Sequence, residues 1–98
     1  MKNSNSKKWF VYLLECDDGT FYTGITNDLE ARIDTHNEGK GAKYTRGRTP
    51  VKLKIYFEFE DRSEASKVEY LIKELSRKQK EELISGKIPL HSILGNVE

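Results

Sequence analysis

The clearest pattern in the chain is a strict alternation of apolar and polar residues over positions 52–60. Its apolar members are Leu53, Ile55, Phe57 and Phe59. A period of two predicts a strand with one buried face, on which these four residues lie together. The direction of this strand stays open, because a helical segment and a loop separate it from the preceding apolar run.

Two shorter apolar runs, 9–16 and 20–26, flank the turn signal Asp17-Asp18-Gly19 and predict a β-hairpin. A two-residue loop would place Tyr12 and Tyr22 on opposite faces. A three-residue loop, closed by the glycine at a positive φ, would place Cys16 opposite Thr20 and both tyrosines on one face. We favour the second geometry, because glycine accepts a positive φ without steric cost.

Helical signals mark three further segments, namely residues 28–38, 64–76 and 77–86. We expect Asn27 to cap the first helix in a capping box with Glu30, and Ser63 to cap the second. The second helix carries an apolar stripe of Ala65, Val68, Leu71, Ile72 and Leu75. Glu69 falls at the edge of this stripe, where a carboxylate is costly to bury unless a cation or a donor meets it.

The order of elements, β-β-α-β-α-α, predicts an α+β domain. At 98 residues the chain has the length of one domain. We expect residues 1–8 to be a disordered arm, residues 9–86 the domain, and residues 87–98 a C-terminal tail that packs loosely or is mobile. The stretch 39–50 reads as a loop long enough to be functional.

Composition narrows the classes of protein. The net charge is only +1, which argues against a generally basic nucleic-acid binder. The single cysteine, Cys16, excludes an internal disulfide and a multi-cysteine zinc site, and its strand position predicts a buried or half-buried thiol. The polar amino terminus and the short apolar runs predict neither a signal peptide nor a membrane span, so we expect a cytoplasmic protein.

Positive charge is concentrated in one place. Between residues 39 and 54 there are six basic residues and no acidic one. The candidate DNA-binding residues of this loop are Lys40, Lys43, Tyr44, Arg46 and Arg48. A basic loop beside a helix end suits contact with phosphate. The alternative is a mobile, solvated loop whose charge serves solubility.

The candidate chemistry comes from one short segment. Arg32 and His36 are four residues apart and form a pair along the first helix. With the preferred hairpin register, Tyr12 and Tyr22 would face them. Each of these residues alone has an ordinary structural explanation. Two tyrosines, an arginine and a histidine that converge from one segment are a less common arrangement.

These residues carry a family resemblance. Phe10-Val11-Tyr12 and Tyr22-Thr23-Gly24 resemble the two signature triplets of the GIY-YIG nuclease superfamily, although Phe10 stands where the family has glycine. Arg32 and His36 match the helix arginine and the residue that follows it in the family. Glu69 falls where the family keeps its metal-binding glutamate.

A second set of residues resembles one branch of that superfamily. Thr35-His36-Asn37, Gly39 and the stretch Ala42-Lys43-Tyr44-Thr45 are similar to the small stand-alone bacterial branch related to SLX-type nucleases. Many members of the superfamily carry an asparagine beyond the glutamate. This chain has none between positions 79 and 83, and there Gln79 or Glu81 could substitute, or the role could be absent.

The resemblance implies a small three-stranded antiparallel sheet flanked by helices and a metal-dependent endonuclease. Arg32 would bind the phosphate, and Glu69 would hold one Mg²⁺ or Mn²⁺ ion. A tyrosine, Tyr12 or Tyr22, would act as base, with His36 to orient it or relay its proton. The implied substrate is branched or distorted DNA in repair or recombination, reached with a protein partner for targeting.

Two other interpretations stay open. The chain could be a DNA-binding module that keeps the fold and the basic loop but cuts little or not at all. A purely protein-binding domain is a weaker alternative.

Overall fold

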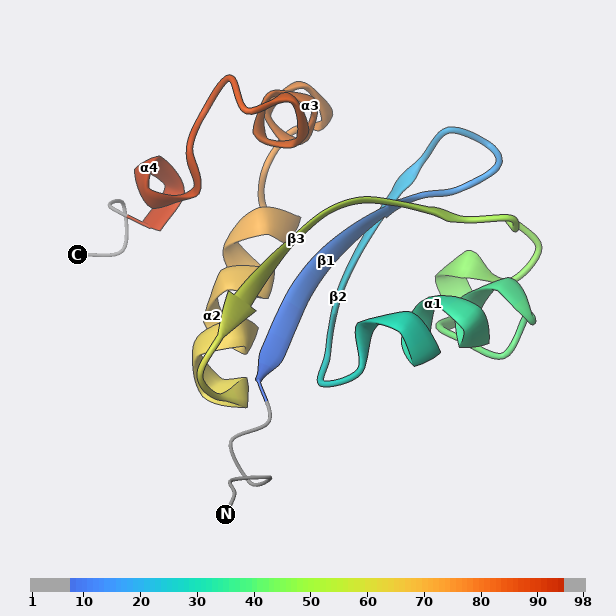
Figure 1. Cartoon of the computed structure of the whole chain (residues 1–98). Coiled ribbons are helices and arrows are strands. Elements are labelled where there is room, and N and C mark those ends of the chain that lie inside the picture. Colours follow the sequence, from blue (N-terminus) through green and yellow to red (C-terminus); the bar gives the residue numbers. More distant parts are fainter. Residues whose placement is uncertain (1–7, 95–98) are drawn as a thin grey trace, which may run out of the picture.

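The computed structural model describes residues 8–94, so residues 1–7 of the predicted arm and residues 95–98 lie outside the described part. Figure 1 shows a sheet with helices on both sides. In chain order the elements are β1 (Trp9–Glu15), β2 (Phe21–Thr26), α1 (Leu29–Asn37), the 3₁₀ turn η1 (Lys43–Thr45), β3 (Lys52–Phe59), α2 (Arg62–Lys73), α3 (Arg77–Ser85) and α4 (Leu90–Leu94).

The sheet has three strands in the order β2-β1-β3, and both pairings are antiparallel. This confirms the predicted α+β class and the three-stranded antiparallel sheet. The hairpin has the three-residue loop, since the Cys16 amide donates to the Thr20 carbonyl at 2.8 Å and Gly19 has φ 85°. Tyr12 consequently pairs with Gly24, and both tyrosines share one face.

The alternation predicted for β3 is interrupted. Leu13 pairs with Ile55, but Leu14 pairs with Leu53, so the register shifts by one residue between these two pairs. Paired residues point to the same face, so the shift places Leu53 on the face opposite Ile55. The expectation that Leu53 shares a face with the other apolar residues of β3 is therefore wrong.

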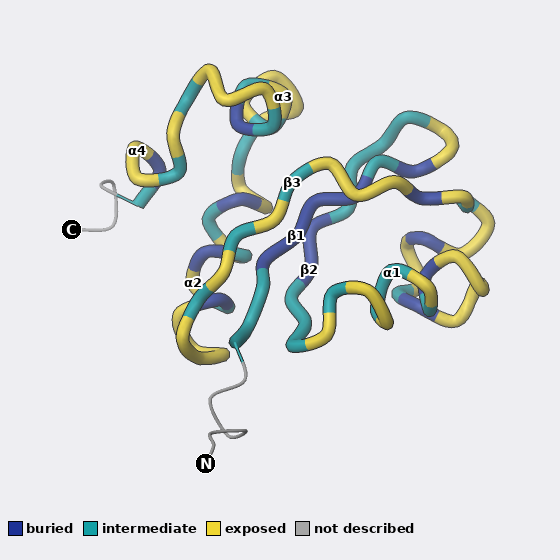
Figure 2. The backbone as a smooth tube through the Cα atoms, viewed as in Figure 1, coloured by how far each residue is buried: buried dark blue, intermediate teal, exposed yellow. Residues whose placement is uncertain are grey.

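Each face of the sheet is covered by its own layer. Val11 and Leu13 of β1 pack with α2, together with Ala65, Val68 and Ile72. On the other face, buried Tyr12 and Leu14 pack with Tyr22 and with Leu29 and Ile33 of α1. Figure 2 shows β1 as the buried centre of the molecule. A strand that is buried on both faces explains why 9–14 reads as a continuous apolar run.

Two of the predicted helix starts are corrected. Asp28, not Asn27, caps α1, because its carboxylate accepts from the Ala31 amide at 3.2 Å. Asp61, not Ser63, caps α2 and accepts from the Glu64 amide at 2.9 Å. In both cases an acidic side chain also lies at the positive end of the helix dipole, which stabilises it there.

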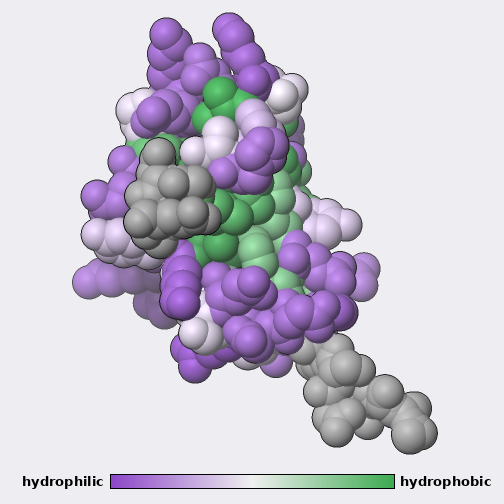
Figure 3. Space-filling model, turned by 90° about the vertical axis from the view of Figure 1, so that its left-hand side faces the viewer, coloured by the Kyte–Doolittle hydropathy of each residue, from purple (hydrophilic) through white to green (hydrophobic). Residues whose placement is uncertain are grey.

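Helix α3 begins with a capping box between Ser76 and Gln79 and ends at Gly86, in the left-handed conformation. The described part of the predicted tail, 87–94, continues into α4, whose Ile93 is buried against the core. Around α2 and α4 the surface shows an apolar patch surrounded by polar residues (Figure 3). No helix in residues 8–94 is long and apolar enough to span a membrane.

Candidate active site

The two tyrosines lie beside each other on the α1 side of the sheet. Their ring centroids are 6.4 Å apart, and Tyr12 is buried whereas Tyr22 is half-buried. Gly24 makes this arrangement possible, because a Cβ at this position would stand only 2.6 Å from the Tyr12 hydroxyl oxygen. Gly24, the third residue of the second triplet, therefore contributes to the site because it has no side chain.

His36 of α1 completes the cluster. It is fully buried, its Nε2 lies 3.0 Å from the Tyr12 hydroxyl, and its Nδ1 lies 2.7 Å from Thr45 Oγ1. The Thr45 hydroxyl has one hydrogen, which it donates to the Ala42 carbonyl at 3.0 Å. It must therefore accept from Nδ1–H of His36, which leaves the Nε2 lone pair to accept the Tyr12 proton.

The electrostatics agree with this assignment. Burial, helped by the charge of Arg32, lowers the pKa of His36 to about 4, so the ring is neutral at pH 7. Burial also raises the pKa of the Tyr12 hydroxyl, and the Arg32 guanidinium beside it opposes that rise without cancelling it. A neutral phenol that donates to a neutral imidazole is the resulting state.

The loop after α1 is folded around His36. Gly41 is buried, and a Cβ there would clash with the His36 ring. Asn37 joins the two ends of the loop, since its Oδ1 accepts from the Val51 amide at 2.7 Å. Sequence reasoning missed Gly24, Gly41 and Thr45 as site residues. Gly24 is part of the second triplet, and Gly41 and Thr45 lie in the segment 35–45 that resembles the family. The resemblance, however, gave these three residues no role.

The candidate DNA-binding residues fall into two groups. Lys40, Lys43 and Arg46 are exposed on the loop. Tyr44 stacks on Tyr22 at 6.0 Å, and the Arg48 guanidinium lies 4.3 Å from the Tyr44 ring centroid.

Arg48 is also tied to the hairpin turn. It donates to the Asp18 carboxylate at 2.9 Å and to the Tyr44 carbonyl at 2.6 Å. Hydrogen bonds from Thr20 and from this guanidinium lower the pKa of Asp18. Arg48 thus joins the loop to the turn, whereas Lys40, Lys43 and Arg46 are exposed on the loop.

Glu69 starts from α2, on the opposite layer from α1 (Figure 1). Its side chain is 21% exposed, and its Oε2 lies 3.3 Å from Lys73 Nζ. Its charge is close enough to raise the pKa of Tyr12. The structure therefore brings Tyr12, Tyr22, Arg32 and His36 into one cluster. Glu69 lies in the other layer, and its charge acts on the Tyr12 hydroxyl.

A divalent cation fits Glu69 only in one way. Among residues 8–94 there is no group of three or more His, Cys, Asp or Glu side chains that could hold a metal ion. Mg²⁺ needs no such cage, because it keeps several waters and completes its shell with phosphate oxygens. A half-buried carboxylate whose present partner is one half-exposed lysine is compatible with that mode of binding.

Comparison with known proteins identifies the family. The GIY-YIG catalytic domain matches residues 8–82, which is most of the chain. The chain belongs to the GIY-YIG family. Its relatives include a UPF0213 protein of Halobacterium salinarum, 59% identical over 74% of this chain and 95% of the relative. A UPF0213 protein of Clostridium perfringens is 61% identical over 80% of this chain and 84% of the relative.

Solved structures agree with the GIY-YIG assignment. The solution NMR structure of a UPF0213 protein from Bacillus halodurans is 51% identical, has a TM-score of 0.54 and covers 82% of this chain and 85% of its own. That of a protein from E. faecalis is 45% identical, has a TM-score of 0.57 and covers 88% and 90% of the two chains. Both are small α+β proteins of the same fold.

In this GIY-YIG domain, the two candidate substitutes for the asparagine, Gln79 and Glu81, both contact other residues of the chain. The Gln79 side chain accepts from the Ser76 amide at 3.0 Å in the capping box of α3. Glu81 pairs with Arg77 at 3.0 Å. Each side chain therefore has a partner near the start of α3 in this structure.

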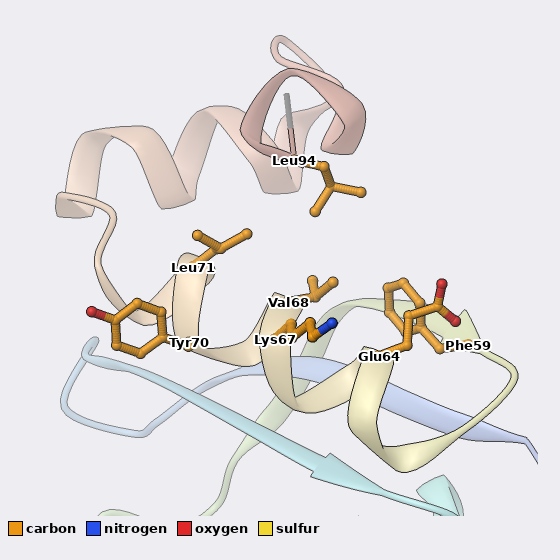
Figure 4. A pocket seen from close by; sticks show the side chains of 7 residues that line it. All are labelled: Phe59, Glu64, Lys67, Val68, Tyr70, Leu71 and Leu94. Atoms are coloured by element: carbon orange, nitrogen blue, oxygen red, sulfur yellow. The ribbon is translucent and has the colours of Figure 1, made fainter. Parts of the chain in front are cut away.

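A separate groove of about 560 Å³ lies between α2, α4 and the end of β3 (Figure 4). Its lining is mostly apolar and consists of Phe59, Val68, Leu71 and Leu94, together with Glu64, Lys67 and Tyr70. It belongs to the α2 layer of this GIY-YIG domain, whereas the tyrosine cluster lies on the α1 side.

Proposed function

We propose that this GIY-YIG protein is a divalent-metal-dependent endonuclease that hydrolyses phosphodiester bonds in branched or distorted DNA, of the kind met in repair and recombination. The observation that carries the proposal is the hydrogen-bonded pair of Tyr12 and neutral His36, set beside Tyr22 and Arg32. Burying polar groups costs free energy unless each of them finds a hydrogen-bond partner. In this buried network the donors and acceptors are matched.

The two tyrosines receive different roles. Tyr12 is buried, donates its proton to His36 and has a raised pKa, so it is poorly suited to take a proton from water. Tyr22 is half-buried, and its ring centroid lies 5.3 Å from that of His36. We assign the base to Tyr22. Tyr12 and His36 are positioning residues that hold the floor of the site.

Charge is supplied by two groups. Arg32, whose guanidinium presents a planar set of donors, would bind the scissile phosphate. Glu69 would hold the metal ion through one oxygen. When bound, the ion supplies charge that stabilises the phosphate and the leaving oxygen. Lys73 would have to leave Glu69, which its exposed position allows.

Glu69→Gln tests the proposal. Gln has nearly the same size but lacks the charge that binds a hard cation, so cleavage of a panel of branched, flapped and single-stranded substrates should be lost in Mg²⁺ or Mn²⁺. Binding measured in chelator should persist. Glu64→Gln, an exposed carboxylate in the first turn of the same helix, is the matched control and should cleave like wild type.

Equal cleavage by Glu69→Gln and wild type would exclude Glu69 as the metal ligand. A wild-type protein that binds the panel but cuts none of it would favour the second candidate, a DNA-binding module. One observation supports that alternative: Gln79 and Glu81, the possible replacements for the asparagine, are engaged within α3. A partner protein that targets the domain to its DNA would then define its role.

A further inference from the structure

Helix α1 covers only part of the face that carries the tyrosines. Leu29 and Ile33 pack over β1 and β2, on Tyr12, Leu14 and Tyr22. On β3, which lies beyond β1, the same face remains open: Leu53 is 37% exposed and Tyr56 is 50% exposed. Figure 2 shows exposed stretches along β3 in yellow.

The open surface is aromatic and adjoins the candidate active site. Tyr56 pairs directly with Tyr12 in the β1–β3 register, so the two side chains leave the sheet on the same face. The half-buried Phe10 ring packs against Tyr56 edge-on, at 5.8 Å and 73°. Half of a large aromatic side chain is thus held in a defined position and left exposed next to the site.

Among residues 8–94 two further tyrosines are exposed. Tyr44, 40% exposed, belongs to the loop after α1 and already stacks on Tyr22. Tyr70 is more exposed, at 63%, but it lies on α2, in the opposite layer. Single exposed aromatic residues are ordinary on protein surfaces. An exposed aromatic residue directly beside the buried tyrosine of a nuclease domain is placed where a substrate would pass.

We infer that Phe10 and Tyr56 form a stacking platform for unpaired bases of the DNA strand whose phosphate Arg32 binds. This rests on the proposed function and names its substrate class: DNA with a single-stranded segment beside the cut, rather than continuous duplex. Bases in a duplex are stacked on one another and cannot offer a face to a side chain, whereas unpaired bases stack readily on aromatic rings.

Charge determines which side of the strand faces β3. Glu58 pairs with Phe10 and shares its face of the sheet. A carboxylate there repels phosphate, so bases, not the backbone, contact the platform. The backbone then runs over Arg32 and the exposed lysines of the loop, on the α1 side. This arrangement splits the strand between an aromatic and a basic surface, as in proteins that bind single strands.

Binding in chelator tests the inference without relying on cleavage. Tyr56→Ala should weaken binding of a labelled oligothymidine by about 5- to 140-fold, the range for loss of one stacked base, and should leave binding of a duplex of equal length unchanged. Tyr56→Phe should restore single-strand binding, because it keeps the ring. Tyr70→Ala is the matched control and should bind like wild type.

An abasic scan gives a readout that misfolding cannot imitate. Removing the base that stacks on Tyr56 should weaken wild-type binding, and should cost nothing further in Tyr56→Ala, because both changes remove the same contact. If Tyr56→Ala binds single strands like wild type, or if every abasic position adds to the mutation, the platform is wrong while the nuclease proposal stands. If the wild-type protein binds no DNA probe, both proposals fail.

Discussion

Tyr12 and Tyr22 carry the same functional group in different surroundings, and the difference predicts unequal consequences of removing it. Tyr22→Phe should lower single-turnover cleavage by about 100-fold or more, the usual range for loss of a general base, and leave stability almost unchanged. Tyr12→Phe should cost about 1–3 kcal/mol in the free energy of unfolding, because the buried Nε2 of His36 loses its donor.

Parallel measurement of cleavage and of urea unfolding separates these outcomes. Tyr44→Phe, which keeps the ring that stacks on Tyr22, serves as a control for the loss of a nearby hydroxyl. Loss of cleavage in Tyr12→Phe without loss of stability would reverse the roles assigned to the two tyrosines.

His36 gives the fold a dependence on pH. Its pKa is about 4 in the folded protein, below the ordinary value of 6.5. Below pH 6.5 the unfolded chain therefore binds a proton that the native state does not, and stability falls as the pH falls. From pH 7 to pH 4.5 the wild-type protein should lose about 2–3 kcal/mol more than His36→Gln, which does not titrate.

Urea denaturation of both proteins at several pH values measures this difference, and other groups cancel because they are common to both. Parallel curves for the two proteins would mean that His36 takes up its proton over the same pH range in the native and unfolded states, which would contradict the lowered pKa.

At the scale of elements, the loop between α1 and β3 combines an ordered framework with exposed charges. Lys43 and Arg46 are exposed, whereas Arg48 is bound to Asp18. Changing Lys43 and Arg46 together to alanine should reduce the slope of log affinity for duplex DNA against log salt by about 2, because two fewer counterions are released.

Binding titrations at several salt concentrations measure that slope. Arg48→Ala is the informative contrast, because it should disturb the packing of Tyr44 and of the hairpin turn more than the salt dependence. An unchanged slope in the double variant would show that the loop does not contact the DNA backbone.

The elements also show what sequence can and cannot predict. The hairpin register followed from local chemistry, since Gly19 accepts the positive φ that a three-residue loop needs. The predicted helix caps were wrong by one or two residues. For α1, both Asn27 and Asp28 can cap a helix, and only the three-dimensional geometry decides between them. The position of Leu53 failed because a register shift depends on the partner strand.

The site divides in the same way. Tyr12, Tyr22, Arg32 and His36 could be named because their spacing in a motif is local. The contact of His36 with Thr45 and that of Arg48 with Asp18 could not, because each joins segments whose approach depends on how the loop closes. The role of a buried polar group in this region can be assigned only when its hydrogen-bond partner is known.

At the scale of the whole molecule, the segment after Gly86 belongs to the packed domain. Ile93 of α4 is only 6% exposed and lies in the core cluster of α2. Ile93→Ala should therefore cost about 2–4 kcal/mol in the free energy of unfolding, as for other buried isoleucines. Leu53→Ala, at a 37% exposed position, is the control and should cost much less.

Chemical denaturation of full-length variants measures both values. Because α4 lies in the α2 layer, a moderately destabilised Ile93→Ala should keep its DNA affinity at temperatures where it remains folded. A negligible cost for this change would mean that α4 is not part of the cooperative unit.

The absence of a side chain at Gly24 makes the protein sensitive to mutation at a position that carries no functional group. One methyl group there would stand 2.6 Å from the Tyr12 oxygen and 3.0 Å from the Tyr22 ring. A random mutagenesis screen for inactive clones should therefore recover Gly24→Ala as readily as changes at either tyrosine. Directed evolution of new specificity has to leave this position alone, although no atom of it would touch the DNA.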